Sequence, residues 1–249
     1  LYEEMGEKVM EWKNDDPEKQ VVSGPYKLMY TDYESIAIFE RIDDWWGKDI
    51  FGLPKPKYVV VRQLKDSNAV IEAFYRGDLD WVGLVIPDLP EHFDEGIGAW
   101  YLHPPYHHPS GPLILWISYR NEELTPIVRK AIAYAIPYEE IKIKAGFNQT
   151  DIPSISLVVD FYERNKKFIN YTLCEIYWGW PDCKPRTDLD KANKILDEAG
   201  YKRDPDGIRR DPNTGERLEG YTIMVPNGWT EWMIMAELIA ENLRKIGIG

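Results

Sequence analysis

The tryptophans are the residues of this sequence whose type and placement most suggest ligand chemistry. The chain has 10 Trp and 16 Tyr among 249 residues. An indole presents a flat apolar face on which a sugar ring can stack while polar groups bond its rim. We expect about three of the ten to contact a ligand, because large aromatic side chains more often fill cores. The candidates lie at expected strand ends or in a stiffened loop: Trp81, Trp116, Trp229, Trp178 and Trp180.

The two cysteines, Cys174 and Cys183, could form a covalent bond. They lie nine residues apart and are the only cysteines of the chain. This pattern favours a disulfide that closes a short loop in a protein outside the reducing cytosol. The alternative is two unpaired thiols that are neighbours by chance. A zinc site would need further Cys or His at ligand spacing. The bridge would stiffen the loop that carries Trp178 and Trp180.

Other groups of polar residues do not predict a catalytic or metal site. His103, His107 and His108 are spread along a proline-rich stretch, which suits a stiff connector better than converging metal ligands. Asp204 and Asp206 belong to a tight turn, which lacks the later oxygen ligands of a calcium loop. The sequence also has no glycine-rich phosphate loop, nucleophile elbow or metalloprotease helix. We therefore expect no catalytic residue, no metal and no cofactor.

Composition restricts the class of protein. The chain has 42 acidic and 30 basic residues, for a net charge of −12. A nucleic-acid partner is not expected, because phosphate binding requires a basic face. The hydrophobic fraction of 44% allows sizeable cores, and no apolar run approaches the ~18 residues of a membrane span. We expect a soluble globular chain. Because it opens at Leu1 and stops just after a helix, we also expect a fragment of a longer protein.

The elements that must position these side chains alternate between strands and helices, which predicts a mixed α/β fold. Apolar residues at helical spacing indicate the helices, and capping residues mark their starts. Residues 147–186 are expected to form a loop. The predicted helices begin at or just after Ser67, Thr125, Pro137, Thr187 and Thr230, with the Ser and Thr residues as caps. The predicted strands cover residues 21–30, 35–41, 58–62, 79–85, 99–102, 113–118 and 221–225, and a further hairpin is centred on residues 208–210.

Several segments together resemble the family 5 extracytoplasmic solute-binding proteins of ABC importers. Their order and spacing extend over nearly the whole chain, although each segment alone is a weak motif. The segments are Gly24–Leu28, Glu40–Gly47, Ala73–Asp80, Val128–Ile136, Leu196–Tyr201 and Ile239–Ile248. One departure is Pro137, which stands where the family usually has Asp before its second helix.

The resemblance implies an α/β, two-lobed periplasmic-binding-protein-like fold that encloses its ligand between the lobes. Residues 1–112 would then be part of the first lobe, and residues 113–249 part of the second, with a hinge strand near 113–118. The fold would be incomplete in this chain, because the N-terminal and C-terminal portions of the family are absent. This piece alone would therefore lack part of a preorganised site.

The resemblance also implies which residues face the ligand cleft. An indole on the turn after residue 225 would stack on a sugar ring, while a neighbouring amide and carboxylate bond its hydroxyls. Alternatively, this indole packs against Met233 as a hydrophobic staple at the start of the helix. The Trp-Gly-Trp loop would form the rim. The cleft positions are Trp81, Trp116, Asn227, Trp229 and Glu231.

Together these features predict the solute-binding component of an ABC importer, which captures an oligosaccharide, with β-linked sugars as candidates, for delivery to a permease. An oligopeptide or dipeptide is the alternative ligand within the same family. A more distant alternative is a carbohydrate-active enzyme, which would require two carboxylates facing each other across a cleft. No strong candidate pair is visible. The expected partners are the ligand and the membrane permease subunits, and we expect a monomer in the periplasm or at the cell surface.

Overall fold

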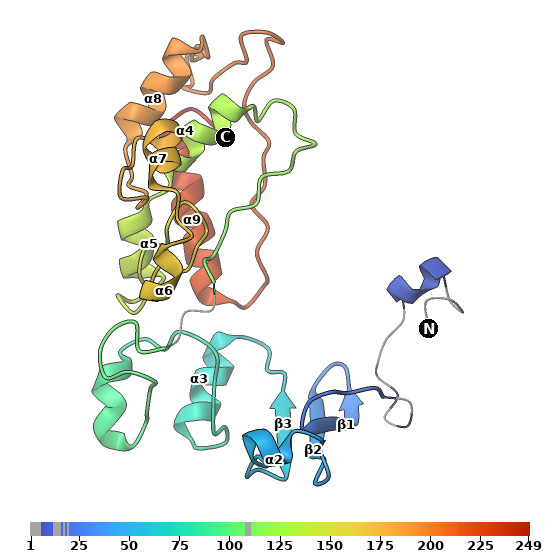
Figure 1. Cartoon of the computed structure of the whole chain (residues 1–249). Coiled ribbons are helices and arrows are strands. Elements are labelled where there is room, and N and C mark those ends of the chain that lie inside the picture. Colours follow the sequence, from blue (N-terminus) through green and yellow to red (C-terminus); the bar gives the residue numbers. More distant parts are fainter. Residues whose placement is uncertain (1–5, 12–15, 17, 19, 108–110) are drawn as a thin grey trace. The chain divides into compact units, whose positions relative to one another are not determined.

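The computed structural model describes residues 6–11, 16, 18, 20–107 and 111–249 (Figure 1). The chain divides into two compact units, Leu1–Lys65 and Asp66–Gly249. The lobe boundary near residue 112, which the resemblance implied, stays a prediction. The last histidine of the proline-rich stretch, His108, lies outside the described residues.

The first unit contains a three-stranded antiparallel sheet in the order β1-β2-β3. The strands are β1 (Tyr26–Asp32), β2 (Ile36–Arg41) and β3 (Tyr58–Arg62), and the short helices are η1 (Gly6–Glu11) and α2 (Lys48–Phe51). β1 and β2 form the predicted hairpin, with Asp32 paired to Ile36. The Asp32 carboxylate accepts hydrogen bonds from the hydroxyl and the backbone N–H of Ser35, and these bonds lower the pKa of that carboxyl. The polar bend between the strands is therefore a closed turn.

The second unit begins with α3 (Ser67–Tyr75), which is followed by η2 (Leu89–Glu95). Asp66 is the N-cap of α3, and its carboxylate accepts a hydrogen bond from the backbone N–H of Ala69. The prediction that Ser67 caps this helix is therefore wrong by one residue. Both residue types cap helices well, but the extended backbone of Asp66 (φ −160°, ψ 170°) makes it the residue that precedes the first turn.

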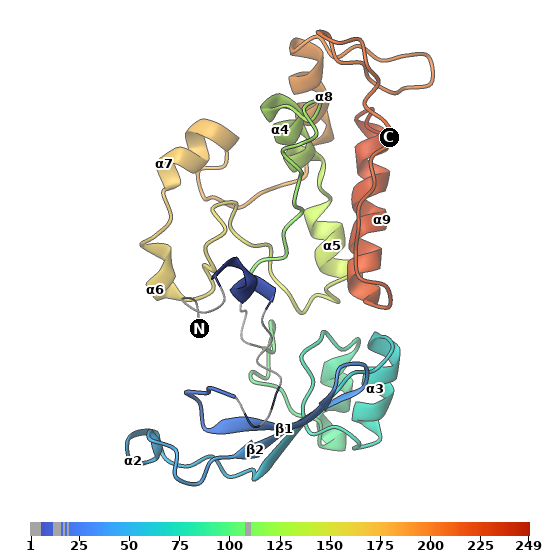
Figure 2. The same cartoon turned by 90° about the vertical axis from the view of Figure 1, so that its right-hand side faces the viewer.

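The core of the second unit is built mainly from helices (Figure 2). They include α4 (Pro126–Ala135), α5 (Tyr138–Lys144), α8 (Leu189–Glu198) and α9 (Thr230–Lys245). α4 packs against α8 and α9, and α5 packs against α9. Val128, Ala131, Ile132 and Ala135 of α4 are buried, which is the spacing of one apolar helix face. No helix in the described ranges is long and apolar enough to cross a lipid bilayer.

The helix starts test the predicted caps. Thr125 caps α4 with its side chain, as predicted. The predicted cap Thr187 is wrong by one residue, because the side chain of Asp188 caps α8. The hydroxyl of Thr187 instead donates to the backbone oxygen of Ile136 at 2.7 Å. This bond ties the chain just after α4 to the start of α8.

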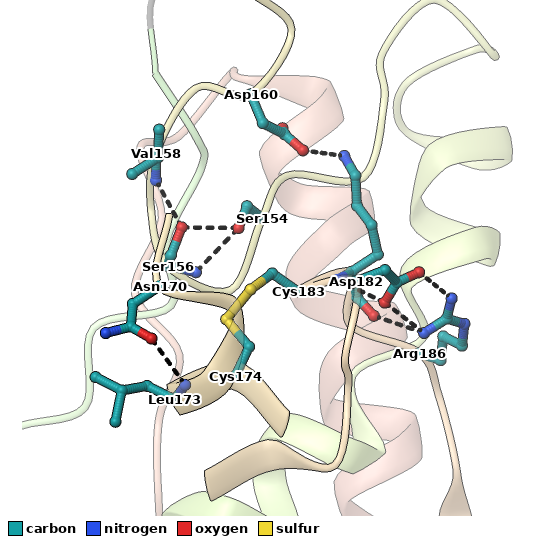
Figure 3. Close-up of a disulfide and its surroundings, with 11 residues drawn as sticks. Ser154, Ser156, Val158, Asp160, Asn170, Leu173, Cys174, Asp182, Cys183 and Arg186 are labelled. Atoms are coloured by element: carbon teal, nitrogen blue, oxygen red, sulfur yellow. Dashed lines mark hydrogen bonds and ion pairs between the residues drawn. A yellow bond between two sulfur atoms is a disulfide. The ribbon is translucent and has the colours of Figure 1, made fainter. Parts of the chain in front are cut away.

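Residues 147–186 contain more structure than the predicted loop. They include α6 (Glu163–Lys166), α7 (Tyr171–Leu173) and the π-helical turn η3 (Cys174–Trp178). Cys174 and Cys183 form a disulfide with their Cα atoms 5.2 Å apart, which confirms the predicted pairing (Figure 3). Both half-cystines are buried beside Ile169. On the surface nearby, Arg186 pairs with Asp182 and lowers the pKa of that carboxyl.

Residues 79–85, 99–102, 113–118 and 221–225 are not strands, which corrects four predictions. Their sequences favour extended backbone, but a strand also needs a neighbour with which to form a ladder of hydrogen bonds. In the described part of the chain, no segment forms a regular ladder with them. The predicted hairpin around residues 208–210 is present as the isolated bridges Arg203↔Arg209 and Arg210↔Arg217.

Arg209 is the largest fully buried side chain of this hairpin and joins it to two helices. Its guanidinium donates to the side-chain oxygens of Asp197 (2.6 Å) and Asn193 (2.9 Å) on α8. Its Nε donates to the backbone oxygen of Ile246, just after α9, at 2.8 Å. The next residue, Gly247, has φ of 84°, and a Cβ there would lie 2.6 Å from Cγ of Arg209. The close approach therefore requires glycine.

Candidate ligand-binding surface

Trp116 lies on an extended segment whose alternate side chains enter the core. Leu115 and Ile117 pack against the hydrophobic core of the second unit, whereas Trp116 between them is 83% exposed. Successive side chains of an extended backbone point to opposite sides. The packing of Leu115 and Ile117 therefore holds the indole of Trp116 out toward solvent, as an apolar platform on an anchored backbone.

Trp229 lies in the turn that joins residues 221–225 to α9. The preceding Gly228 has φ of 83°, a conformation that glycine adopts readily. Trp229 is the N-cap residue of α9, without a side-chain cap bond, so the prediction that Thr230 caps this helix is wrong by one residue. The indole packs edge-to-face against Trp232, with ring centroids 5.1 Å apart, and is 48% exposed. Met233, the proposed staple partner, is itself partly exposed.

The turn that carries Trp229 is tied to the start of α3. The backbone N–H of Ser67 donates to the oxygen of Gly228 at 3.0 Å. The Ser67 hydroxyl lies 3.2 Å from the same oxygen and 3.4 Å from Oε2 of Glu231, and can donate to either. Glu231 is half-buried, and Asn227 is exposed. The sequence analysis did not assign Ser67 to this region, because a contact across 161 positions leaves no local pattern.

Trp81 is a third exposed indole of the second unit, at 72%. Its ring lies close to Gly83, where an added Cβ would meet it at 3.4 Å. Trp100, which the sequence analysis did not single out, is also 66% exposed. Within the described ranges, no ring contact joins Trp81, Trp116 and Trp229 to one another. The structure therefore presents these indoles singly and does not bring them into one stack.

The Trp178–Trp180 loop is only partly a surface. Trp180 is 5% exposed, its ring lies 4.7 Å from that of Tyr134, and it stacks on Trp178 at 5.8 Å. The Tyr134 hydroxyl donates to the backbone oxygen of Trp178, and burial raises the pKa of this hydroxyl. The structure thus places Trp180, a predicted ligand contact, in the core against α4, and leaves Trp178 half-buried. α7, which leads into η3, lies on the opposite side of the unit from α9 (Figure 2).

The carboxyl groups with a shifted pKa are not among the residues that form this surface. Among the described residues, every carboxyl group with a resolved shift has its pKa lowered, by arginine, lysine or serine donors. These groups are Asp32, Asp182, Asp204, Asp206, Glu219 and Glu241. A glycosidase acid needs a carboxyl whose pKa is raised. Exposed indoles beside an amide and a carboxylate instead suit stacking on, and hydrogen bonding to, a polyhydroxylated ligand.

Comparison with known proteins connects this geometry to a family. The profile described as "Bacterial extracellular solute-binding proteins, family 5 Middle" matches residues 2–249. The chain is similar to the oligopeptide-binding protein OppA of Bacillus subtilis, with 23% identity over 173 residues and 67% of this chain covered. It is also similar to the probable peptide-binding protein YejA of Agrobacterium fabrum, with 25% identity over 259 residues and 91% of this chain covered. The chain spans 30% and 41% of the lengths of these relatives.

Two solved structures extend the comparison. The mannohexaose-bound periplasmic oligopeptide-binding protein of Thermotoga maritima has 31% identity and a TM-score of 0.77, over 98% of this chain and 43% of that one. The nonapeptide-bound oligopeptide-binding protein AppA of Bacillus subtilis has 20% identity and a TM-score of 0.68, over 100% of this chain and 46% of that one. The second likeness shows the fold alone. Together they confirm a mixed α/β chain that forms part of a periplasmic-binding-protein fold.

Proposed function

Because this chain belongs to family 5 of the bacterial extracellular solute-binding proteins, we propose that it is part of a receptor that captures an oligosaccharide for an ABC importer. The membership confirms the resemblance inferred from the sequence motifs. In this proposal, residues 1–112 contribute to one lobe and residues 113–249 to the other. The extended segment 113–118 crosses the hinge, and the ligand lies between the lobes.

The observation that carries the proposal is the exposure of Trp116. Its backbone is fixed by Leu115 and Ile117, which pack into the core, while its own ring is 83% exposed. Exposure of a large apolar ring to water costs free energy, and the anchored backbone prevents the ring from turning inward. A sugar face stacked on the ring would remove this cost. Trp81 and Trp229 provide further indole surfaces. The mannohexaose bound to the 31% identical Thermotoga structure supports a ligand of this class.

The turn at the start of α9 supplies the polar part of the proposed site. Asn227 is exposed and can both donate to and accept from sugar hydroxyls. Glu231 accepts through its carboxylate, and Ser67 holds one of its oxygens. Trp229 would stack beside them. Trp178, which stacks on the buried Trp180, would contact a sugar apart from this turn.

A peptide is the second candidate ligand, and the names of the curated relatives favour it. OppA is called an oligopeptide-binding protein and YejA a probable peptide-binding protein. The AppA structure contains a nonapeptide. A site for a peptide needs hydrogen-bond donors and acceptors along the peptide backbone and charged groups for its termini. The residues proposed here are chiefly indoles. We therefore rank the oligosaccharide first.

The remaining parts of the proposal concern the setting of the protein. We propose a binding protein rather than an enzyme, because the family model that matches residues 2–249 is one of extracellular solute-binding proteins. The partners would be the permease subunits of the importer, with no nucleic acid, because the net charge is −12. The receptor would act as a monomer outside the cytoplasm, in the periplasm or at the cell surface.

A ligand screen by thermal unfolding tests the proposal. The screen should use a full-length receptor. In this receptor, the regions that this chain does not span are supplied by those of the relatives. Mannohexaose, cellohexaose and a nonapeptide would be added at increasing concentration. A ligand at 100 times its Kd stabilises the folded state by about 2.7 kcal/mol, so we expect a rise in Tm with at least one oligosaccharide. A rise with the nonapeptide alone would support the peptide candidate and contradict the oligosaccharide proposal.

A further inference from the structure

A cavity in the second unit lies away from the Trp229 turn. Its volume is about 370 Å³, which falls within the range of about 300–1,000 Å³ for small-molecule sites. α4, η3 and the start of α8 contribute its walls. The side chains that matter for its chemistry are Lys130, Tyr134, Glu175, Trp178, Trp180 and Lys191.

The aromatic wall of this cavity is fixed by the core. Trp178 and Trp180 stack with an interplanar angle of 6°, and Trp180 packs against Tyr134. The Tyr134 hydroxyl also holds the backbone of Trp178. Gly179, between the two indoles, has φ of 71° and ends η3. The indole of Trp178 is therefore held in place although it is only half-buried.

Three of the four charged side chains of the cavity are not engaged elsewhere. Lys130, Lys191 and Glu175 form no side-chain hydrogen bond or ion pair with any other described residue. Other lysines nearby behave differently: Lys194, one turn further along α8, pairs with Glu198. The cavity thus combines two ammonium donors and the carboxylate of Glu175, all free to bind a ligand, with a second carboxylate, that of Asp188, which caps α8.

We infer that this cavity is a second saccharide subsite, which takes a neutral mono- or disaccharide unit of roughly one or two pyranose rings. A pyranose needs an apolar surface for one ring face and both donors and acceptors for its hydroxyls. Trp178 supplies the surface, Lys130 and Lys191 donate, and Glu175 accepts. The inference rests on the proposed function in one respect, namely that the ligand is a sugar.

The subsite is separate from the surface around Trp229. α7, which runs directly into η3, and α9 lie on opposite sides of the unit in Figure 2. The two indoles can therefore be observed and disrupted independently.

The test follows indole N–H signals by NMR in the complete receptor, using mannobiose, cellobiose and the dipeptide Ala-Ala as probes. The signals of Trp178 and Trp229 are assigned with Trp178→Phe and Trp229→Phe. We expect one of the disaccharides to shift the Trp178 signal in a saturable manner, with a Kd that Trp229→Ala leaves unchanged. Lys191→Ala and Glu175→Gln should each weaken this binding at least fivefold. Lys194→Ala, an exposed lysine of the same helix outside the cavity, should leave it unchanged.

Four results would overturn the inference. The Trp178 signal could stay fixed while a disaccharide moves the Trp229 signal, in which case the proposed function stands and the subsite does not exist. Lys191→Ala and Lys194→Ala could have equal effects. Ala-Ala could move the Trp178 signal where no disaccharide does, which would assign the cavity to a zwitterionic ligand. If neither disaccharide moves either signal, the subsite fails, and the titration with mannohexaose decides the oligosaccharide proposal.

Discussion

Two aromatic regions of the second unit use the same residue type in opposite ways. In the disulfide-bridged region, Trp180 is 5% exposed and packs on Tyr134 and Trp178. On the extended segment before α4, Trp116 is 83% exposed although both of its neighbours pack into the core. The sequence predicted a ligand contact in both places. The difference shows that the elements packed against an indole, and not the local motif around it, decide whether it is core or surface.

The comparison predicts that the two indoles differ most in their contribution to stability. Trp180→Ala should leave a cavity in the core and lower the free energy of unfolding by about 3–5 kcal/mol. Trp116→Ala should change it by less than about 0.5 kcal/mol, because the ring makes little packing contact. Urea unfolding of both variants checks this. Equal losses would mean that the two regions do not differ as described.

The buried face of α4, which carries Ile132, should belong to the core and not to the ligand surface around Trp229. Ile132 of α4 is 4% exposed, and Ile132→Ala should lower the free energy of unfolding by about 2–4 kcal/mol. The affinity for ligand per folded molecule should stay unchanged. Ile127→Ala, on the exposed side of the same helix, is the matched control for stability. A large loss of affinity in folded Ile132→Ala protein would place the buried face of α4 in the binding site.

The disulfide should account for part of the rigidity of the buried region. Replacing Cys174 and Cys183 together by alanine should lower the free energy of unfolding by about 2–3 kcal/mol, on the chain-entropy description of a loop this short. The same double variant should leave the exposure of Trp116 to a collisional fluorescence quencher unchanged. Protein purified without reductant should have no free thiol by mass measurement. Two free thiols there would contradict the bridge.

Acid should weaken the charged hairpin, and it should also weaken the exposed Asp182–Arg186 pair beside the disulfide. Arg217 pairs with Asp204, Asp206 and Glu219, at 2.5–2.6 Å, and their pKa values are lowered by arginine donors. Groups with a lowered folded-state pKa stabilise the fold above their unfolded pKa, and this contribution is lost as the pH falls through the folded value.

The free energy of unfolding should therefore fall as the pH drops from about 5 to 3. Arg217→Met should flatten this dependence, because the carboxylates lose their shared partner. Lys194→Met, whose residue pairs with a single exposed carboxylate, serves as the control and should leave the slope nearly unchanged. The same slope in Arg217→Met and in the unaltered protein would exclude the network as its cause.

Local signals in the sequence predicted local structure well. The Thr125 cap, the apolar face of α4 and the β1–β2 hairpin are confirmed, because each depends on residues close together in the chain. The caps at Ser67, Thr187 and Thr230 are each wrong by one residue. In the first two cases two adjacent side chains could cap, and only the backbone dihedral angles select between them. The disulfide was predictable because only one pairing exists.

Features that depend on distant partners could not be predicted in the same way. Residues 113–118 and 221–225 have the composition of strands, but a strand also requires a neighbour to pair with. The burial of Trp180 depends on Tyr134, which lies on a different helix. The contact of Ser67 with the Trp229 turn joins residues 161 positions apart. For the candidate site, the sequence predicted which residue types take part. It did not predict which of these side chains lie close together in space.

The central claim, that the exposed indoles bind a sugar, is tested most directly by calorimetric titration of mannohexaose into Trp229→Ala and Trp116→Ala variants of the complete receptor. Trp46→Ala, which removes an exposed indole from the first unit, is the control. We predict that the two site variants each lose affinity tenfold or more, about 1.4 kcal/mol, with an unchanged Tm, and that the control keeps its affinity. Unchanged mannohexaose affinity in both site variants, or tight nonapeptide binding with no mannohexaose binding, would contradict the account.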